Sequence, residues 1–205
     1  MKRILEISTG IIHPPLRARR IVHRIITDQN CYEIKRISSI EGVRKLHEGS
    51  WDAVLIYLHR QKISSQAAGI LDEFVRNGGG LLGLHSASAS YKTCDQFYEL
   101  LGGRFKSHGP VQDFSIVQDD ASLFCQMDGV NITDELYYHT LKKDITVHFS
   151  TSDAEGVKIP LVWTRTHGTG LVCYSAPGHT VSSIENPLVQ KIILKGIAWV
   201  SHNNT

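Results

Sequence analysis

Strand and helix patterns alternate along the first half of the chain, and this regular order limits the folds that the sequence can adopt. Short apolar runs at residues 2–8, 31–37, 51–58 and 81–84 have the pattern of strands, and the segments between them have helical spacing. A β-α-β order of this kind requires right-handed crossovers and places helices on both faces of a parallel sheet. The sequence therefore predicts a doubly wound, mostly parallel α/β sheet.

Apolar spacing and turn residues define the predicted helices of this half. The first helix follows Pro14 and Pro15, and its apolar face consists of Ala18, Ile21, Val22, Ile25 and Ile26. A short helix is expected at residues 40–47. Ser64 caps a further helix, which ends at the glycines of residues 78–80, because glycine tolerates the left-handed conformation found at helix C-termini.

The second half of the chain is richer in strands. Extended patterns cover residues 111–118, 145–151, 161–166 and 171–175, with a hairpin turn at 168–170, and a last helix begins at Asn186 and Pro187. The chain has no internal repeat, low-complexity tract or linker. Residues 1–205 are therefore predicted to form a single domain with a strand-rich C-terminal half.

Composition excludes several classes of protein. A net charge of +2 and the lack of a dense Lys/Arg stripe argue against nucleic acid as a partner. No apolar segment approaches the roughly 20 residues that cross a bilayer, which argues against a membrane partner. The four cysteines have no paired spacing, and Cys31 and Cys173 are expected to act as small hydrophobes in strands. These observations favour a soluble, cytoplasmic protein.

Ligands of open α/β sheets bind outside the carboxyl ends of the strands. This rule selects, among the histidines of the chain, those that follow a predicted strand as candidates for a site. His13, His59, His85 and His179 each follow a predicted strand. At residues 80–87 a strand runs directly into small residues, which is the pattern of a nucleophile elbow with His85 at its tip. Histidine there favours a base or a metal ligand over an acyl nucleophile. The alternative is a tight turn with incidental polar residues.

Two further segments offer polar side chains. In residues 134–139, alternation places Glu135, Tyr137 and His139 on one face of a strand, where they form either part of a site or the outer side of an edge strand. His108 precedes Gly109 and Pro110 in a segment that forms either a loop over the pocket or a surface turn. Tyr137, Tyr138 and Trp163 are candidates to stack on a sugar ring, although aromatic residues in strands commonly belong to the core.

Four segments, in this order, resemble the ThuA-like (trehalose-utilisation) family: GGGLLGLHSAS from residue 78, LLGGRFKSHG from residue 100, DELYYH from residue 134 and YSAPGHT from residue 174. The resemblance covers nearly the whole chain. It implies a flavodoxin-like core of the class I glutamine amidotransferase-like superfamily, and a role in carbohydrate metabolism.

The chain departs from the glutamine amidotransferases at the residues that carry their chemistry. Those enzymes have a Cys at the elbow, whereas this sequence has His85 followed by Ala87 where the last elbow glycine would be, and Cys94 lies too far along to substitute. His179 falls near the position of the late catalytic histidine, but Val181 occupies the place of the following Glu. Thiol-based glutamine hydrolysis is therefore not expected. A His-Ser pair at the elbow resembles the ThuA-like family itself.

We therefore expect an enzyme that performs acid–base chemistry on a sugar or keto-sugar. The predicted catalytic residues are His85, His179 and Glu135, and the predicted substrate-binding residues are His13, Ser86, His108, Tyr137 and His139. A divalent metal such as zinc is a possible cofactor, although no close ligand pair such as H-x-x-x-H occurs. A nicotinamide is not expected, because residues 8–13 lack the glycine-rich turn.

The alternative is a non-catalytic domain that binds a small molecule or takes part in an assembly, since a fold does not establish a function. An enzyme predicts that His85, His179 and Glu135 converge, whereas a binding domain predicts dispersed histidines. The expected partner is a sugar-like small molecule, and a homo-oligomer is compatible with the sequence.

Overall fold

The computed structural model describes residues 1–10, 14–59, 61–120 and 122–202. In chain order the elements are β1 (Lys2–Ser8), α1 (Leu16–Thr27), β2 (Tyr32–Ile37), the 3-10 helix η1 (Ile40–His47), β3 (Ala53–Tyr57), α2 (Ser65–Arg76), β4 (Gly80–Leu84), α3 (Ser86–Ser90), α4 (Asp95–Leu101), β5 (Gly103–Gln118), β6 (Val130–Leu141), β7 (Thr146–Ser152), β8 (Lys158–His167), β9 (Gly170–Ser175), α5 (Val181–Glu185) and α6 (Pro187–His202). The result is a mixed α/β structure.

One nine-stranded sheet crosses the described part of the molecule, in the order β2-β1-β3-β4-β9-β8-β7-β5-β6. The pairs from β2 to β9 are parallel, whereas the pairs from β9 to β6 are antiparallel. The prediction of a mostly parallel sheet is therefore wrong for half of its pairs. The reason is that β7, β8 and β9 follow one another through short turns, which connect antiparallel neighbours, and that β5 pairs antiparallel with both β6 and β7.

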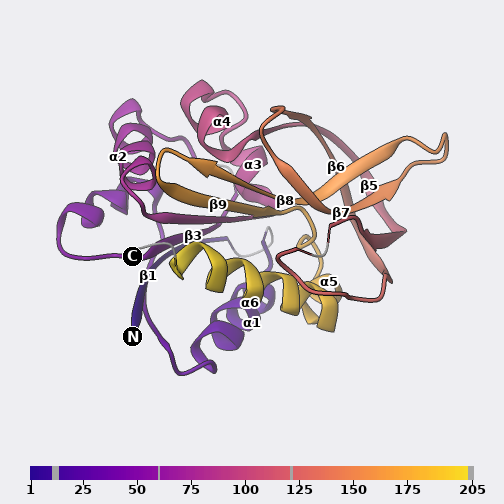
Figure 1. Cartoon of the computed structure of the whole chain (residues 1–205), viewed down its shortest axis with the longest axis horizontal. Helices are drawn as coiled ribbons and strands as arrows, with labels where there is room; N and C mark the ends of the chain where they lie inside the picture. Colours follow the sequence, from indigo (N-terminus) through magenta and orange to yellow (C-terminus); the bar gives the residue numbers. More distant parts are fainter. Residues whose placement is uncertain (11–13, 60, 121, 203–205) are drawn as a thin grey trace.

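Helices lie on both faces of the parallel half (Figure 1). Helices α1, α5 and α6 contact one another on one face, and α2 packs with η1 and α4 on the other. Burial explains this arrangement, because the predicted stripe of α1 faces the sheet with Ala18, Ile21, Val22 and Ile26 buried. A buried aliphatic side chain of this size stabilises the fold by about 1.5–3 kcal/mol. Ser64 caps α2 as predicted, since its Oγ accepts a 3.1 Å hydrogen bond from the N–H of Ala67.

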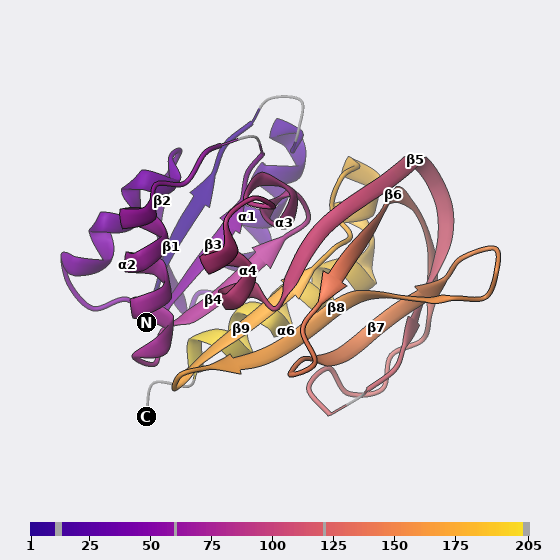
Figure 2. The ribbon, with the colours of Figure 1, turned by 90° about the horizontal axis from the view of Figure 1, so that it is seen from above.

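Strands β5 and β6 form a long antiparallel hairpin at the opposite end of the sheet from β2 (Figure 2). The segment with His108, Gly109 and Pro110 was expected to be a loop or turn, but it lies inside β5. The register of β5 against β6 shifts between Phe105 and Ser107 and again between His108 and Val111. The second irregularity spans Pro110, which has no N–H for the ladder.

The expectation for Cys31 is corrected by the structure. Cys31 is exposed and lies just before β2, so it does not act as a buried hydrophobe, whereas Cys173 in β9 is buried. All four cysteines are free.

Arg19 connects α1 to β1. Its guanidinium donates to the carbonyl oxygen of Ser8 at 2.9 Å and to that of Gly10. The side chain thereby anchors the carboxyl end of β1.

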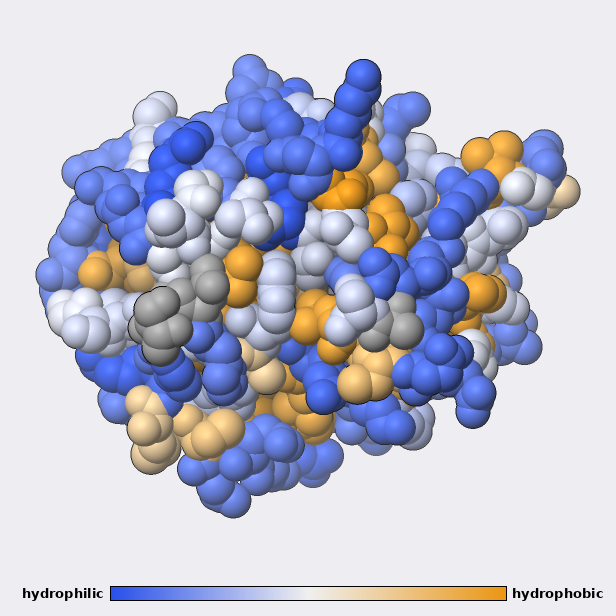
Figure 3. Space-filling view, in the orientation of Figure 1, coloured by the Kyte–Doolittle hydropathy of each residue, from blue (hydrophilic) through white to orange (hydrophobic). Residues whose placement is uncertain are grey.

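The surface is mainly polar on the face that the space-filling view displays, where hydrophobic residues form small separate groups (Figure 3). Within the described ranges, no helix has both the length and the apolar character needed to cross a bilayer. The hydrophobic core instead lies between the sheet and its helices. Its largest fully buried side chains include Trp163, Tyr57, Tyr137, Tyr174 and Phe124.

Candidate functional site

His85 occupies a strained turn between β4 and α3. Its backbone has φ 41° and ψ −102°, a conformation that costs a residue with a Cβ about 1–3 kcal/mol. Two contacts with β9 hold the turn: the N–H of His85 donates to the carbonyl of Ser175 at 2.7 Å, and the Tyr174 hydroxyl donates to the carbonyl of His85 at 2.7 Å. The structure therefore has the sharp strand-to-helix turn that residues 80–87 predict.

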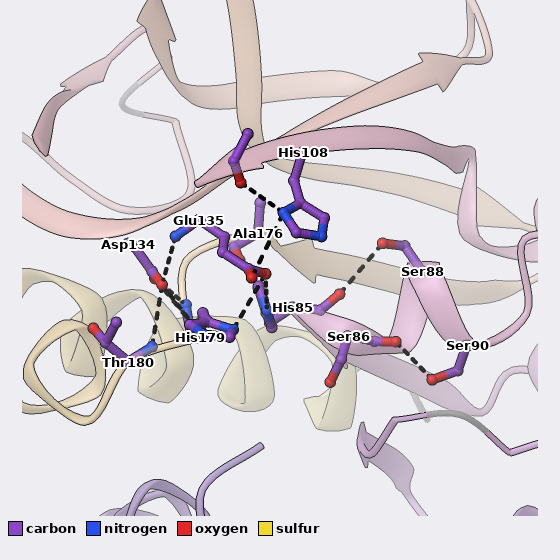
Figure 4. A network of polar contacts seen from close by, with 12 residues as sticks. His85, Ser86, Ser88, Ser90, His108, Asp134, Glu135, Ala176, His179 and Thr180 are labelled. Atoms are coloured by element: carbon purple, nitrogen blue, oxygen red, sulfur yellow. Dashed lines mark hydrogen bonds and ion pairs between the residues drawn. The ribbon is translucent and has the colours of Figure 1, made fainter. Parts of the chain in front are cut away.

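Three imidazoles surround the carboxylate of Glu135, which projects from β6 (Figure 4). Its Oε2 lies 3.2 Å from Nδ1 of His179 and 3.6 Å from Nε2 of His85. Its Oε1 lies 3.6 Å from Nδ1 of His108. We call His85, Glu135 and His179 the central cluster. Its members come from the end of β4, from β6 and from the segment that follows β9, so the two halves of the sheet meet in it.

Backbone contacts hold both imidazoles of the central cluster in place. Nδ1 of His85 lies 2.8 Å from the carbonyl oxygen of Ala176. The buried carboxylate of Asp134 accepts hydrogen bonds from the N–H groups of Gly178 (2.6 Å), His179 (3.0 Å) and Thr180 (3.1 Å). Local sequence patterns did not reveal this role of Asp134, because the N–H groups that it binds lie 44 to 46 residues further along the chain.

Tyr137 is buried beneath the imidazoles. Its ring centroid lies 4.2 Å from that of His85, 5.5 Å from that of His108 and 4.7 Å from that of Phe105. With 1% of its surface exposed, Tyr137 does not present an open face to a sugar. Trp163 is fully buried and likewise belongs to the core. The ring of Tyr137 instead supports His85 and His108.

Electrostatics give the members of the central cluster different charges. Burial opposes ionisation of Glu135, but the hydrogen bond to His85 and the nearby His179 and His108 outweigh it and hold the pKa of Glu135 below its ordinary value. Burial lowers the pKa of His179, and the charge of Glu135 only partly offsets that effect. At neutral pH an ionised carboxylate therefore lies beside a neutral imidazole, which is a pair suited to accepting a proton.

The remaining predicted site residues lie outside the central cluster. His139 shares the face of β6 with Glu135 and Tyr137, but its Nε2 is 3.0 Å from Oγ of Ser88, and burial lowers its pKa to about 3. Ser86 is fully buried in α3, and its carbonyl accepts a 2.8 Å hydrogen bond from the hydroxyl of Ser90. His13 lies outside the described residues.

The central cluster has the donor set of a metal site. One ligand atom from each of its three residues lies within 4.8 Å of the others. By contrast, a cavity of about 610 Å³ near Trp51, Phe74 and Thr169 lies at the amino ends of the parallel strands. Ligands of open α/β sheets bind at the carboxyl ends, so the central cluster is the better candidate for the functional site.

One family model matches most of the chain. The family model described as trehalose utilisation, ThuA, matches residues 8–200. The chain is a member of the ThuA family. The matched range includes β4, β6 and the segment after β9, so all three residues of the central cluster lie within the part shared with the ThuA family.

Solved structures give the same assignment of fold. A ThuA-like protein from Parabacteroides merdae is 16% identical, with a TM-score of 0.85, and the match covers 98% of this ThuA-family chain and 90% of that chain. A cytoplasmic protein from Salmonella typhimurium is 14% identical, with a TM-score of 0.72, over 97% of this chain and 99% of that one. No curated protein matches the sequence.

A further match shows the same fold inside a larger protein. The β-galactosidase from Bacillus circulans is 13% identical with a TM-score of 0.68, and the match covers 97% of this ThuA-family chain but 30% of the enzyme. At this identity the likeness concerns the fold alone.

Proposed function

We propose that this ThuA-family chain is an enzyme that performs acid–base chemistry on a sugar or keto-sugar at the central cluster. The observation that carries the proposal is the carboxylate of Glu135, which lies within 3.6 Å of both His85 and His179, with His85 held in a strained turn. Strained residues and perturbed titratable groups concentrate at functional sites. The sugar is suggested by the description of the ThuA family as trehalose utilisation.

The chemistry follows from the protonation states of the cluster. His179, held neutral by burial, accepts a proton from the carbon next to a keto group. The C–H bond breaks, its electron pair forms a carbon–carbon double bond, and the keto oxygen becomes an enolate oxygen. Glu135 then stabilises the imidazolium of His179 across 3.2 Å. Return of the proton to the opposite face of the same carbon gives epimerisation. Where that carbon carries a hydroxyl, transfer of the hydroxyl proton to the enolate oxygen and return of the abstracted proton to the former carbonyl carbon give isomerisation. Loss of a leaving group from the next carbon gives elimination.

The position of the site in the fold supports the same proposal. We propose that the strand order β2-β1-β3-β4-β9 represents the flavodoxin-like, doubly wound core that the resemblance implies. A non-catalytic domain would not need three imidazoles, from the buried His85 to the exposed His108, to converge on one carboxylate. His85 and Glu135 are buried, and removing such polar groups from water lowers the stability of the fold. A functional role explains why the fold retains them.

Hydrogen exchange at carbon tests the proposal without knowledge of the final product. The protein is incubated in D₂O with ketoses and with keto derivatives of glucose and trehalose, and NMR measures deuterium at the carbon next to the carbonyl. The wild type is expected to catalyse exchange for at least one sugar. His179→Ala is expected to reduce the rate about 100-fold or more, the usual contribution of a general base.

The control is His47→Ala, because His47 is exposed at the end of η1, away from the cluster. This variant is expected to retain the wild-type rate. Absence of exchange and of turnover for every sugar with the wild-type protein would overturn the proposed function. Equal rates in the wild type and His179→Ala would remove His179 from the role of base.

A further inference from the structure

We propose that the central cluster binds one divalent cation of the zinc class, with Nε2 of His85, a carboxylate oxygen of Glu135 and Nδ1 of His179 as its ligands. The inference rests on the proposed function in treating the same cluster as the reactive centre, but its test needs no substrate. It goes further because it names the ion and the atom of each residue that binds it.

The spacing of the ligand atoms fits a preformed tetrahedral site. A zinc ion with ligands at about 2.0–2.1 Å places neighbouring ligand atoms about 3.4 Å apart. The Oε2 atom of Glu135 lies 3.6 Å from Nε2 of His85 and 3.2 Å from Nδ1 of His179. All three atoms lie within 4.8 Å of one another, so small side-chain rotations would complete the coordination.

Hydrogen bonding around His85 directs a lone pair into the cluster. The carbonyl oxygen of Ala176 can only accept a hydrogen bond, so Nδ1 of His85, 2.8 Å away, carries the proton. The other ring nitrogen, Nε2, is then the one that can bind an ion, and it faces Oε2 of Glu135 at 3.6 Å. A cation between a ring nitrogen and a carboxylate oxygen stabilises their close approach in the interior. That cation is either a proton on Nε2 or a metal ion.

The outer contacts are those of a metal site. Histidine ligands almost always donate their second ring N–H to a carbonyl or carboxylate, as His85 does to Ala176. Asp134 fixes the backbone of His179 with a buried carboxylate. Preorganised support of this kind holds ligands in one geometry before an ion arrives.

The ligand set selects the class of ion. Two imidazole nitrogens and one carboxylate favour zinc, iron or a similar transition metal over Mg²⁺ and Ca²⁺, which prefer oxygen ligands. Three protein ligands leave a fourth position open, as in catalytic zinc sites. A bound ion would polarise the keto oxygen of a substrate and make the neighbouring C–H bond more acidic. With Nδ1 bound to the ion, His179 would be a ligand and not the proton acceptor, so proton abstraction by His179 belongs to the metal-free form of the cluster.

Metal titration of the full chain tests the inference. After removal of metal with a chelator, the protein is titrated with Zn²⁺ by calorimetry and with Co²⁺ by visible spectroscopy. The expected results are one ion per chain and the intense visible bands of four-coordinate Co²⁺. Glu135→Gln and His179→Ala are expected to weaken Zn²⁺ binding at least about 100-fold, the upper range for loss of an outer-shell partner.

His47→Ala is the control, because His47 is exposed at the end of η1, away from the cluster. It is expected to bind Zn²⁺ within about threefold of the wild type. Thermal unfolding without metal establishes that each variant is folded, and Zn²⁺ is expected to raise the midpoint of the wild type but not of Glu135→Gln.

Two results would overturn the inference: no Zn²⁺ or Co²⁺ bound by the wild type, or equal affinity in the wild type and both ligand variants. Neither result decides the proposed function. Sugar exchange that persists in a metal-free protein would retain the enzyme and reject the ion. Stoichiometric metal binding without activity on any sugar would retain the ion and reject the sugar chemistry.

Discussion

The backbone N–H of His179 donates a 3.0 Å hydrogen bond to Oδ1 of Asp134, so a residue of β6 fixes the segment that carries one imidazole of the central cluster. The neighbouring residue on β6, Glu135, meets the side chain of the same histidine. Two consecutive residues of one strand therefore set both the backbone and the ring position of His179.

Asp134→Asn is expected to lower the free energy of unfolding by about 2 kcal/mol or more. The asparagine side chain has one acceptor oxygen for three N–H donors, and hydrogen bonds to a charged group contribute about 1.5–3 kcal/mol each. Urea unfolding measures the change. Asp113→Asn, on the exposed part of β5, is the control and is expected to change stability by less than about 0.5 kcal/mol. Equal losses in the two variants would contradict the role assigned to Asp134.

His85→Gly is expected to be more stable than His85→Ala by about 1 kcal/mol. Alanine retains the Cβ that makes a φ of 41° unfavourable, whereas glycine adopts this conformation without strain. The larger conformational entropy of glycine in the unfolded chain offsets only part of this advantage. Both variants lose the imidazole, so their difference isolates the backbone. Chemical unfolding of the pair measures it, and a more stable alanine variant would show that the turn is unstrained.

The stability of the protein is expected to fall as the pH drops below about 6.5, partly because of His148 in β7. Burial lowers the pKa of His148, against a smaller opposing effect of Asp120. The unfolded chain therefore takes up a proton at a pH where the folded chain does not, and stability is lost as the pH falls toward the folded pKa. In His148→Gln, the loss of unfolding free energy between pH 7.5 and 5.5 is expected to be smaller than in the wild type.

At pH 7.5 the same variant is expected to be less stable by about 1 kcal/mol, because the 2.7 Å contact between Nε2 of His148 and the Thr164 hydroxyl is altered. His47→Gln, at an exposed position, is expected to leave the pH dependence unchanged. A pH profile of His148→Gln that is parallel to that of the wild type would show that His148 does not titrate differently in the two states.

Gly170→Ala is expected to destabilise the protein by about 2–3 kcal/mol. A Cβ at Gly170 would lie 2.0 Å from the carbonyl oxygen of Val75 and 2.4 Å from that of Gly79, so the backbone would have to move. Gly69→Ala is the opposite case, because a Cβ there meets nothing within 4 Å and alanine favours the helix. It is expected to raise stability by up to about 1 kcal/mol. Thermal unfolding of both variants checks the two signs.

Local patterns predicted the parallel half of the fold well. The apolar stripe of α1, the Ser64 cap of α2 and the buried run of β3 depend on residues close together in the chain, and all three are present. The start of β5 at Gly103 was not predicted, because its pairing depends on β6 and on bulges that a local pattern does not reveal. Strand β8 runs antiparallel to β9, and from this pair onward the sheet is antiparallel.

The candidate site was predictable in its members more than in its arrangement. The strand-end rule selected His85 and His179, and alternation placed Glu135 on the same face as Tyr137 and His139. Alternation could not separate His139 from the site, because its burial depends on contacts with Ser88 and Trp163. The roles of the residues in catalysis remain predictions that the experiments above address.

The order of folding follows from the placement of β9 beside β4. These strands are parallel neighbours, yet the chain between them builds the whole antiparallel half, and the contact between His85 and Ala176 joins residues 91 apart. Closing so long a loop is slow, because the chain loses conformational entropy before the contacts that stabilise the closed loop have formed. An intermediate without docked β9 would lack both the acceptor for His85 and the segment with His179. Capacity to bind Zn²⁺ or a substrate should therefore emerge in the last kinetic phase of refolding, after most helical signal has returned.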